Sequence, residues 1–175
     1  MPAVLHYSLV LFFLWLLAAA AAHKFLHHDY TTGLIRSYVP AGETGAGLLA
    51  WLVAVMEADL ALGLAVAPLR QAAFTATAAL LLAYLLGMAG LLARGRVDAR
   101  CGCAGPASDM RISPALLIRN GMLVLLAVVG TLPVAGVLSM TVAVSAGLMG
   151  VFLIAAYLCV EQLLHNAQHL AEIRR

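Results

Sequence analysis

Residues 48–92 read LLAWLVAVMEADLALGLAVAPLRQAAFTATAALLLAYLLGMAGLL, with Pro68-Leu69-Arg70-Gln71 interrupting an otherwise apolar sequence. Each of the two apolar runs has the length of roughly 20 residues that an α-helix needs to cross a bilayer. A lone spanning segment must be helical, because only a helix satisfies its own backbone hydrogen bonds in lipid. The stretch therefore predicts a tight hairpin of two transmembrane helices.

The rest of the chain has the same character, with further apolar runs at 3–22, 115–137 and 140–164. Of the 175 residues, 64% are hydrophobic and 10% charged, and the mean hydropathy is +1.01. A soluble domain of this length cannot bury so much apolar surface. We expect an all-α, polytopic membrane helix bundle of about five transmembrane helices, with residues 1–175 as a single integral membrane domain.

Two local patterns refine this expectation. Ser113-Pro114 is typical of a helix start, with Ser at the N-cap and Pro at the first helical position, and Pro133 should bend or loosen the same helix near its end. The first run resembles a secretory signal peptide, but residues 1–6 contain no Lys or Arg. Because the basic segment of a signal peptide is missing, we expect a helix of the mature protein.

The charges bear on topology rather than on nucleic acid, because a formal net charge of +2 is too mild to indicate a nucleic-acid partner. With five crossings, nine of the ten Lys and Arg residues fall on or near one side, and Arg70 alone on the other. The nine are Lys24, Arg36, Arg94, Arg96, Arg100, Arg111, Arg119, Arg174 and Arg175. The positive-inside rule would make their side cytoplasmic.

Residues 93–114 form the longest polar stretch, a predicted extramembrane loop on the same side, and contain Cys101-Gly102-Cys103. Two thiols one residue apart can close a small, strained disulfide, and strained disulfides exchange readily. Gly102 and Gly105 would ease closure of so short a ring. The pattern favours a thiol-exchange device over an inert pair of loop cysteines.

Cations precede these thiols at Arg94, Arg96 and Arg100. Positive charge stabilises a thiolate, which is the species that attacks disulfides and binds soft metals. Cys101 follows Arg100 directly, so we favour Cys101 as the attacking thiolate.

Three charged residues, Glu57, Asp59 and Arg119, lie inside predicted spans. Unpaired charge at membrane depth is costly, so such groups should face the bundle interior and find partners. We predict a Glu57–Arg119 ion pair beneath the loop, which is either structural or handles protons during thiol exchange. Asp59 could snorkel or form a hydrogen bond.

The remaining candidate ligands are Cys159 and four histidines. Cys159 stands alone in an apolar run and is predicted to be a buried packing residue. His165 and His169 are spaced i, i+4 and could chelate a metal with the thiols, as could His27 and His28. We favour interfacial histidines without that role, and no metal site is predicted.

The pattern Gly95-Arg96-x-Asp98-x-x-Cys101-Gly102-Cys103-x-Gly105, followed by Ser113 and Arg119-Asn120, resembles the methylamine utilization protein MauE family. That family is related to the DoxX-like redox-associated membrane proteins, which implies a four-helix core plus one helix. His23-Lys24, Tyr38-x-Pro40 and Glu57 also fit, so the resemblance covers roughly residues 16–130. It implies Cys101 and Cys103 as the reacting residues. The supporting residues would be Arg96, Asp98, Arg100, Gly102, Gly105, Arg119, Asn120 and Glu57.

The resemblance implies a protein of the bacterial inner membrane that assists disulfide formation and assembly of the methylamine dehydrogenase small subunit. That subunit is periplasmic and rich in disulfides, and a thioredoxin-like, membrane-anchored partner is expected. The charge bias instead places the thiols in the cytoplasm. We favour the periplasm, because thiolate stabilisation or partner docking explains the loop arginines.

Three functions stay open from the sequence. The first is a thiol–disulfide oxidoreductase acting through the CxC pair. The second is a soft-metal protein that binds or transports copper or zinc with the same thiolates. The third is a scaffold for the thioredoxin-like partner. No cofactor is predicted, because a quinone has no local motif in this chain.

Overall fold

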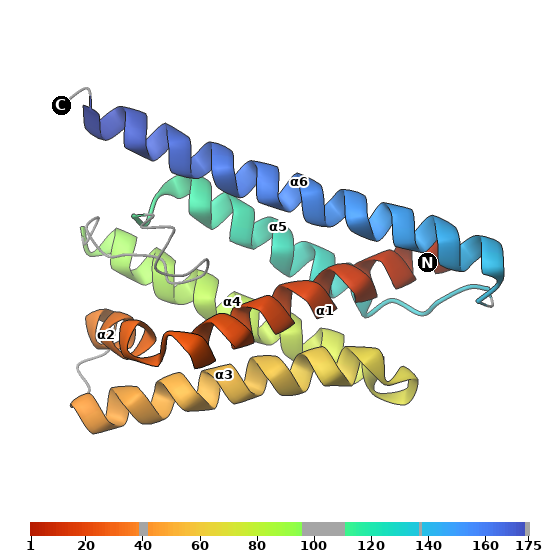
Figure 1. Cartoon of the computed structure of the whole chain (residues 1–175), viewed down its shortest axis with the longest axis horizontal. Helices are drawn as coiled ribbons and strands as arrows, with labels where there is room; N and C mark the ends of the chain where they lie inside the picture. The colour runs from red at the N-terminus through yellow and green to blue at the C-terminus, as the bar shows by residue number, and fades with distance from the viewer. Residues whose placement is uncertain (39–41, 96–110, 137, 174–175) are drawn as a thin grey trace.

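The computed structural model describes residues 1–38, 42–95, 111–136 and 138–173. These residues form six α-helices and one short 3₁₀ helix, so the predicted all-α bundle is confirmed (Figure 1). In chain order the helices are α1 (Ala3–Leu26), α2 (His28–Tyr38), α3 (Glu43–Ala65), η1 (Ala67–Leu69), α4 (Arg70–Ala93), α5 (Pro114–Gly130) and α6 (Met140–Ile173).

Four segments are long and apolar enough to cross a membrane, namely α1, α3, η1 with α4, and α6. The fifth apolar helix, α5, has 17 residues, which at 1.5 Å per residue reach roughly 26 Å. Large apolar side chains such as Leu62, Leu86, Leu125 and Leu148 are exposed along the bundle. Apolar exposure this extensive suits lipid and not water, so the chain is a multi-pass membrane protein.

Helix α5 begins where the sequence predicts, but it ends earlier than predicted. Ser113 is the extended N-cap and Pro114 the first helical residue. The helix stops at Gly130, although the apolar run continues to residue 137. Pro133 explains the early end, because it has no N–H for the helical ladder and its ring clashes with the preceding turn.

Helix α2 was not predicted, because residues 23–47 contain no apolar run of membrane-spanning length. Its inner face is formed by Thr31, which is buried, and by the partly buried Leu34, Ile35 and Tyr38, whereas Arg36 on its outer face is exposed. This spacing follows the helical repeat. The helix is short and packs mainly against α3, and α3 itself begins at Glu43, five residues before the predicted run.

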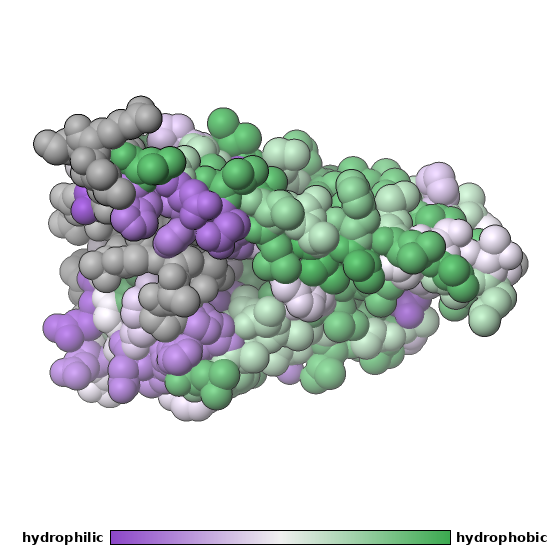
Figure 2. All heavy atoms as spheres, turned by 45° about the horizontal axis from the view of Figure 1, so that its top comes forward, coloured by the Kyte–Doolittle hydropathy of each residue, from purple (hydrophilic) through white to green (hydrophobic). Residues whose placement is uncertain are grey.

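The helices meet at two ends of the bundle. At one end α1, α4 and α6 finish, α3 and α5 begin, and α2 lies across them (Figure 1). We call this the loop end, because residues 96–110 connect α4 to α5 there. Hydrophilic side chains gather at this end and an apolar band covers the middle of the bundle (Figure 2).

Candidate functional site

The predicted reacting residues lie outside the described residues. These are Cys101 and Cys103, together with the supporting Arg96, Asp98, Arg100, Gly102 and Gly105, all within 96–110. Their proposed roles stay predictions. The structure does describe both flanks of the segment, and it describes the other three predicted site residues, Glu57, Arg119 and Asn120.

The loop's second flank is held by α6. The side-chain oxygen of Gln168 accepts a hydrogen bond from the Arg111 backbone N–H at 3.0 Å, and its amide nitrogen donates to the Arg111 carbonyl at 2.9 Å. The same nitrogen donates to Ser113 Oγ at 3.3 Å. Beneath this flank, Ile112 and Leu116 are buried against α4. The residues that lead into α5, 111–113, are therefore held in place by α6 and α4.

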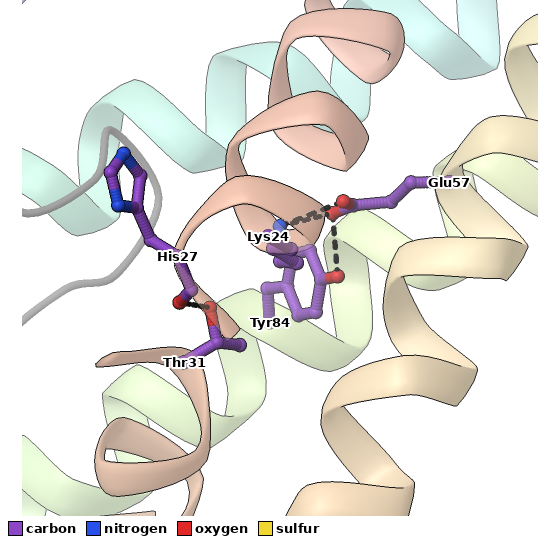
Figure 3. Close-up of polar contacts among 5 residues, drawn as sticks. All are labelled: Lys24, His27, Thr31, Glu57 and Tyr84. Atoms are coloured by element: carbon purple, nitrogen blue, oxygen red, sulfur yellow. Dashed lines mark hydrogen bonds and ion pairs between the residues drawn. The ribbon is translucent and has the colours of Figure 1, made fainter. Parts of the chain in front are cut away.

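Glu57 lies in the middle of α3 and is 1% exposed. Lys24 Nζ, from the end of α1, donates to its two carboxylate oxygens at 2.8 and 2.7 Å. The hydroxyl of Tyr84, from α4, donates to Glu57 Oε1 at 2.8 Å. We call Lys24, Glu57 and Tyr84 the Lys24 cluster (Figure 3). A buried carboxylate with an ammonium and a hydroxyl on it is compensated in charge and hydrogen bonding.

The predicted Glu57–Arg119 ion pair is wrong. Arg119, buried in α5, donates to Glu161 of α6 at 2.8 Å. The sequence prediction named neither actual partner, which are Lys24 in the last turn of α1 and Glu161 in α6. Helices α1 and α3 pack side by side with Glu57 at the level of Lys24. No local sequence pattern gives that offset between two helices.

Asn120 connects the buried arginine to α4. Its side-chain oxygen accepts from Arg119 Nη2 at 3.3 Å, and its amide nitrogen lies 3.5 Å from Met88 Sδ. The Arg119 guanidinium also lies over the Tyr157 ring, 5.5 Å from its centre. We call Arg119, Asn120 and Glu161 the Arg119 cluster. It joins α5, α6 and α4 below the flanks of the loop.

A cavity of about 180 Å³ lies between the two clusters. Most of the residues lining it are apolar, among them Leu16, Leu81 and Leu123. Lys24 and Tyr84 line it from the Lys24 cluster, and Asn120 lines it from the Arg119 cluster. Asn120 and Glu57 were predicted as site residues, but the cavity between their two clusters was not predicted.

Two other residues of the sequence analysis, Cys159 and Asp59, are both exposed. Cys159 was predicted to be buried, and this is wrong, because it is exposed on α6 among apolar side chains. Its surroundings would be lipid, which accepts a small apolar thiol as readily as a protein core does. The expectation that intramembrane charges face the bundle interior holds for Glu57 and Arg119, which are buried, and is wrong for Asp59, which is exposed on α3. Within the described residues no three His, Cys, Asp or Glu side chains converge as a metal site would require.

Comparisons of the sequence with known proteins identify a family. The profile of the family described as methylamine utilisation protein MauE matches residues 1–133, which include α1 to α5. The methylamine utilization protein MauE of Paracoccus denitrificans is 33% identical over 159 residues, covering 90% of this chain and 85% of that protein. No solved structure matches the chain significantly. On the family profile and the identity over most of both lengths, the chain belongs to the MauE family of methylamine utilisation proteins.

Proposed function

We propose that this protein assists disulfide formation in the methylamine dehydrogenase small subunit, with Cys101 and Cys103 as the exchanging thiols. Membership of a methylamine utilisation family, in a chain whose longest polar stretch carries a CxC pair, is the observation that carries the proposal. A thioredoxin-like, membrane-anchored protein is the proposed partner.

The chemistry is a pair of thiol–disulfide exchanges. A client thiolate attacks the Cys101–Cys103 disulfide, which breaks, and one client sulfur is joined to one loop sulfur. A second client thiolate then displaces the loop sulfur, so the client gains a disulfide and the CxC pair is left as two thiols. Each turnover oxidises the client and reduces the CxC pair by two electrons.

The described flanks of the loop support this role. Arg94 at the end of α4 and Arg111 before α5 are both exposed. Guanidinium groups near a thiol favour its thiolate form, which is also the better leaving group in exchange. The Gln168 contacts hold Arg111 and Ser113, the described residues that follow the CxC segment, in a fixed position.

A periplasmic loop is part of the proposal, and two ion pairs weaken the contrary charge count. Lys24 is neutralised by Glu57, and Arg119 by Glu161. Both cations are accounted for inside the bundle and need no cytoplasmic surface. Arg94 and Arg111 flank the CxC segment in the sequence, and thiolate stabilisation or partner docking would explain them.

The test is a Cys101→Ser/Cys103→Ser double variant in a methylamine-using bacterium that lacks the native copy. We expect small-subunit disulfides and assembled dehydrogenase to be lost while the variant protein stays in the membrane. Cys159→Ser is the matched control and should assemble the enzyme normally, because that thiol lies on α6. Normal assembly in the double variant would reject the proposal and leave a scaffold.

A further inference from the structure

The cavity between the two clusters has the size and lining of a small-molecule site. Its volume is about 180 Å³, and an apolar cavity of roughly 150 Å³ is enough to hold a benzene ring. Residues from all six α-helices line it, including Leu34 of α2, Val53 of α3 and Tyr157 of α6. An apolar pocket with a few placed polar groups is the usual form of a ligand site.

Two side chains in the lining, Lys24 and Asn120, each have an N–H donor that no acceptor in the described residues engages. An ammonium group has three N–H donors, and the contacts of Lys24 in the described residues engage two of them, both on Glu57. The Asn120 amide has two N–H donors, and within the described residues its one acceptor is the weakly accepting sulfur of Met88 at 3.5 Å. Lys24 comes from α1 and Asn120 from α5, so a ligand with two separated acceptors can meet both.

The charge of the site favours a neutral ligand. Lys24 is already balanced by the Glu57 carboxylate at 2.7 Å, and Arg119 by Glu161 at 2.8 Å. An anion in the cavity would meet Lys24 only as a cation that Glu57 already neutralises, and its own charge would be desolvated. A neutral molecule that accepts hydrogen bonds has neither cost.

The proposed function requires a two-electron acceptor. Each client disulfide leaves Cys101 and Cys103 as two thiols, so the protein needs a two-electron acceptor to act again. Met88 and Asn120 lie within about two turns of the ends of α4 and α5 that flank the CxC segment. A neutral, lipid-soluble ring with two carbonyl oxygens satisfies the size, the donors, the charge and the electron balance together.

We propose that this cavity binds a lipid-soluble para-quinone, which reoxidises the CxC pair; the electron source rests on the proposed function. The two S–H bonds are lost as the S–S bond forms, and two electrons and two protons convert the ring carbonyls to hydroxyls. Lys24 and Asn120 donate to the carbonyl oxygens and stabilise the negative charge that develops there.

The binding test uses purified full-length protein in detergent and decylubiquinone as the probe. We expect saturable binding that is weakened at least tenfold in Ala20→Trp, because Ala20 lines the cavity and the indole fills it. Ala19→Trp is the matched control on the neighbouring, exposed position and should bind normally. Asn120→Leu removes one donor and should weaken binding about tenfold. Absent saturable binding, or equal loss in both Trp variants, overturns the site.

Two further measurements separate the occupant from the electron route. Oleate should compete poorly, and competition as strong as that of unlabelled quinone would overturn the proposal in favour of an acyl-chain site. Reduced wild-type protein should yield one quinol per CxC pair, and Cys101→Ser/Cys103→Ser should bind quinone unchanged yet yield none. Binding without quinol in the wild type overturns the acceptor role. Normal dehydrogenase assembly in the double variant, with binding intact, rejects the proposed function alone.

Discussion

Glu57 holds a negative charge at the centre of the bundle, and Lys24 compensates it. In a Lys24→Met variant the carboxylate keeps only the hydroxyl of Tyr84, so an unpaired charge is left buried. We expect a loss of about 3–5 kcal/mol in the free energy of unfolding. Thermal unfolding of the purified protein in detergent measures it.

A second variant tests whether charge is the cause. Lys24→Met combined with Glu57→Gln removes both charges, and it should recover most of the lost stability. Glu43→Gln is the control, because Glu43 is exposed at the start of the same helix, at the polar loop end, and surface changes usually stay within about 0.5 kcal/mol. Equal damage in the single and double variants would show that packing, not charge, decides the effect.

Single residues also show where sequence reasoning reached its limit. The need to pair Glu57 and Arg119 was predictable, because charge at membrane depth requires a partner. The choice of partner was not, since it depends on how far α1, α3 and α6 are displaced along one another. The cavity between the clusters depends on the same displacements, and no local sequence pattern indicates it.

Gly130 sets how closely α5 approaches α4. A Cβ built at this position lies 2.4 Å from Cδ1 of the buried Phe74 ring, and α4 and α5 pack along their lengths. Gly130→Ala should therefore lower the free energy of unfolding by about 1–3 kcal/mol through overpacking. Gly121→Ala is the control in the same helix, where nothing lies within 4 Å. Equal stability of both variants in thermal unfolding would contradict the close approach.

The contact between α6 and the loop flank gives a second prediction for these elements. Gln168→Ala removes the hydrogen bonds that hold the Arg111 backbone and Ser113. Deuterium uptake of a peptide covering 111–113 should rise several-fold, because local opening becomes easier. Gln162→Ala is the matched control, since Gln162 bonds within α6 to Asn166. Unchanged uptake in Gln168→Ala would show that buried Ile112 alone holds the flank.

At the level of elements, the apolar runs predicted five helices because length and hydropathy are local properties. Ser113-Pro114 also located the start of α5. Helix α2 was missed because its eleven residues have little apolar excess and its order depends on packing against α3. The end of α5 was overestimated because the apolar composition continues past Gly130, whereas Pro133 limits the helix.

The whole molecule concentrates its polar features at one end. Helix α2 and both flanks of the CxC segment lie at the loop end (Figure 1). Lys24 and Arg119 lie within about two turns of the ends of α1 and α5 there. At the opposite end, Arg70 donates to the carbonyl of Leu64 and lies over the Tyr7 ring. Such asymmetry suits a protein that exchanges electrons at one face of the membrane, and it makes the orientation of the bundle a decisive property.

Orientation is measured by labelling the thiols in intact cells with a membrane-impermeant maleimide, in a Cys159→Ser background. We expect Cys101 and Cys103 to react after reduction, because a client in the periplasm requires the loop end to face that side. A Cys101→Ser/Cys103→Ser/Gln71→Cys variant in the same background is the control. Gln71 is exposed at the start of α4, at the opposite end, and should react only after the membrane is permeabilised. The reverse pattern would place the thiols in the cytoplasm, as the positive-inside rule implies, and would exclude direct exchange with a periplasmic client.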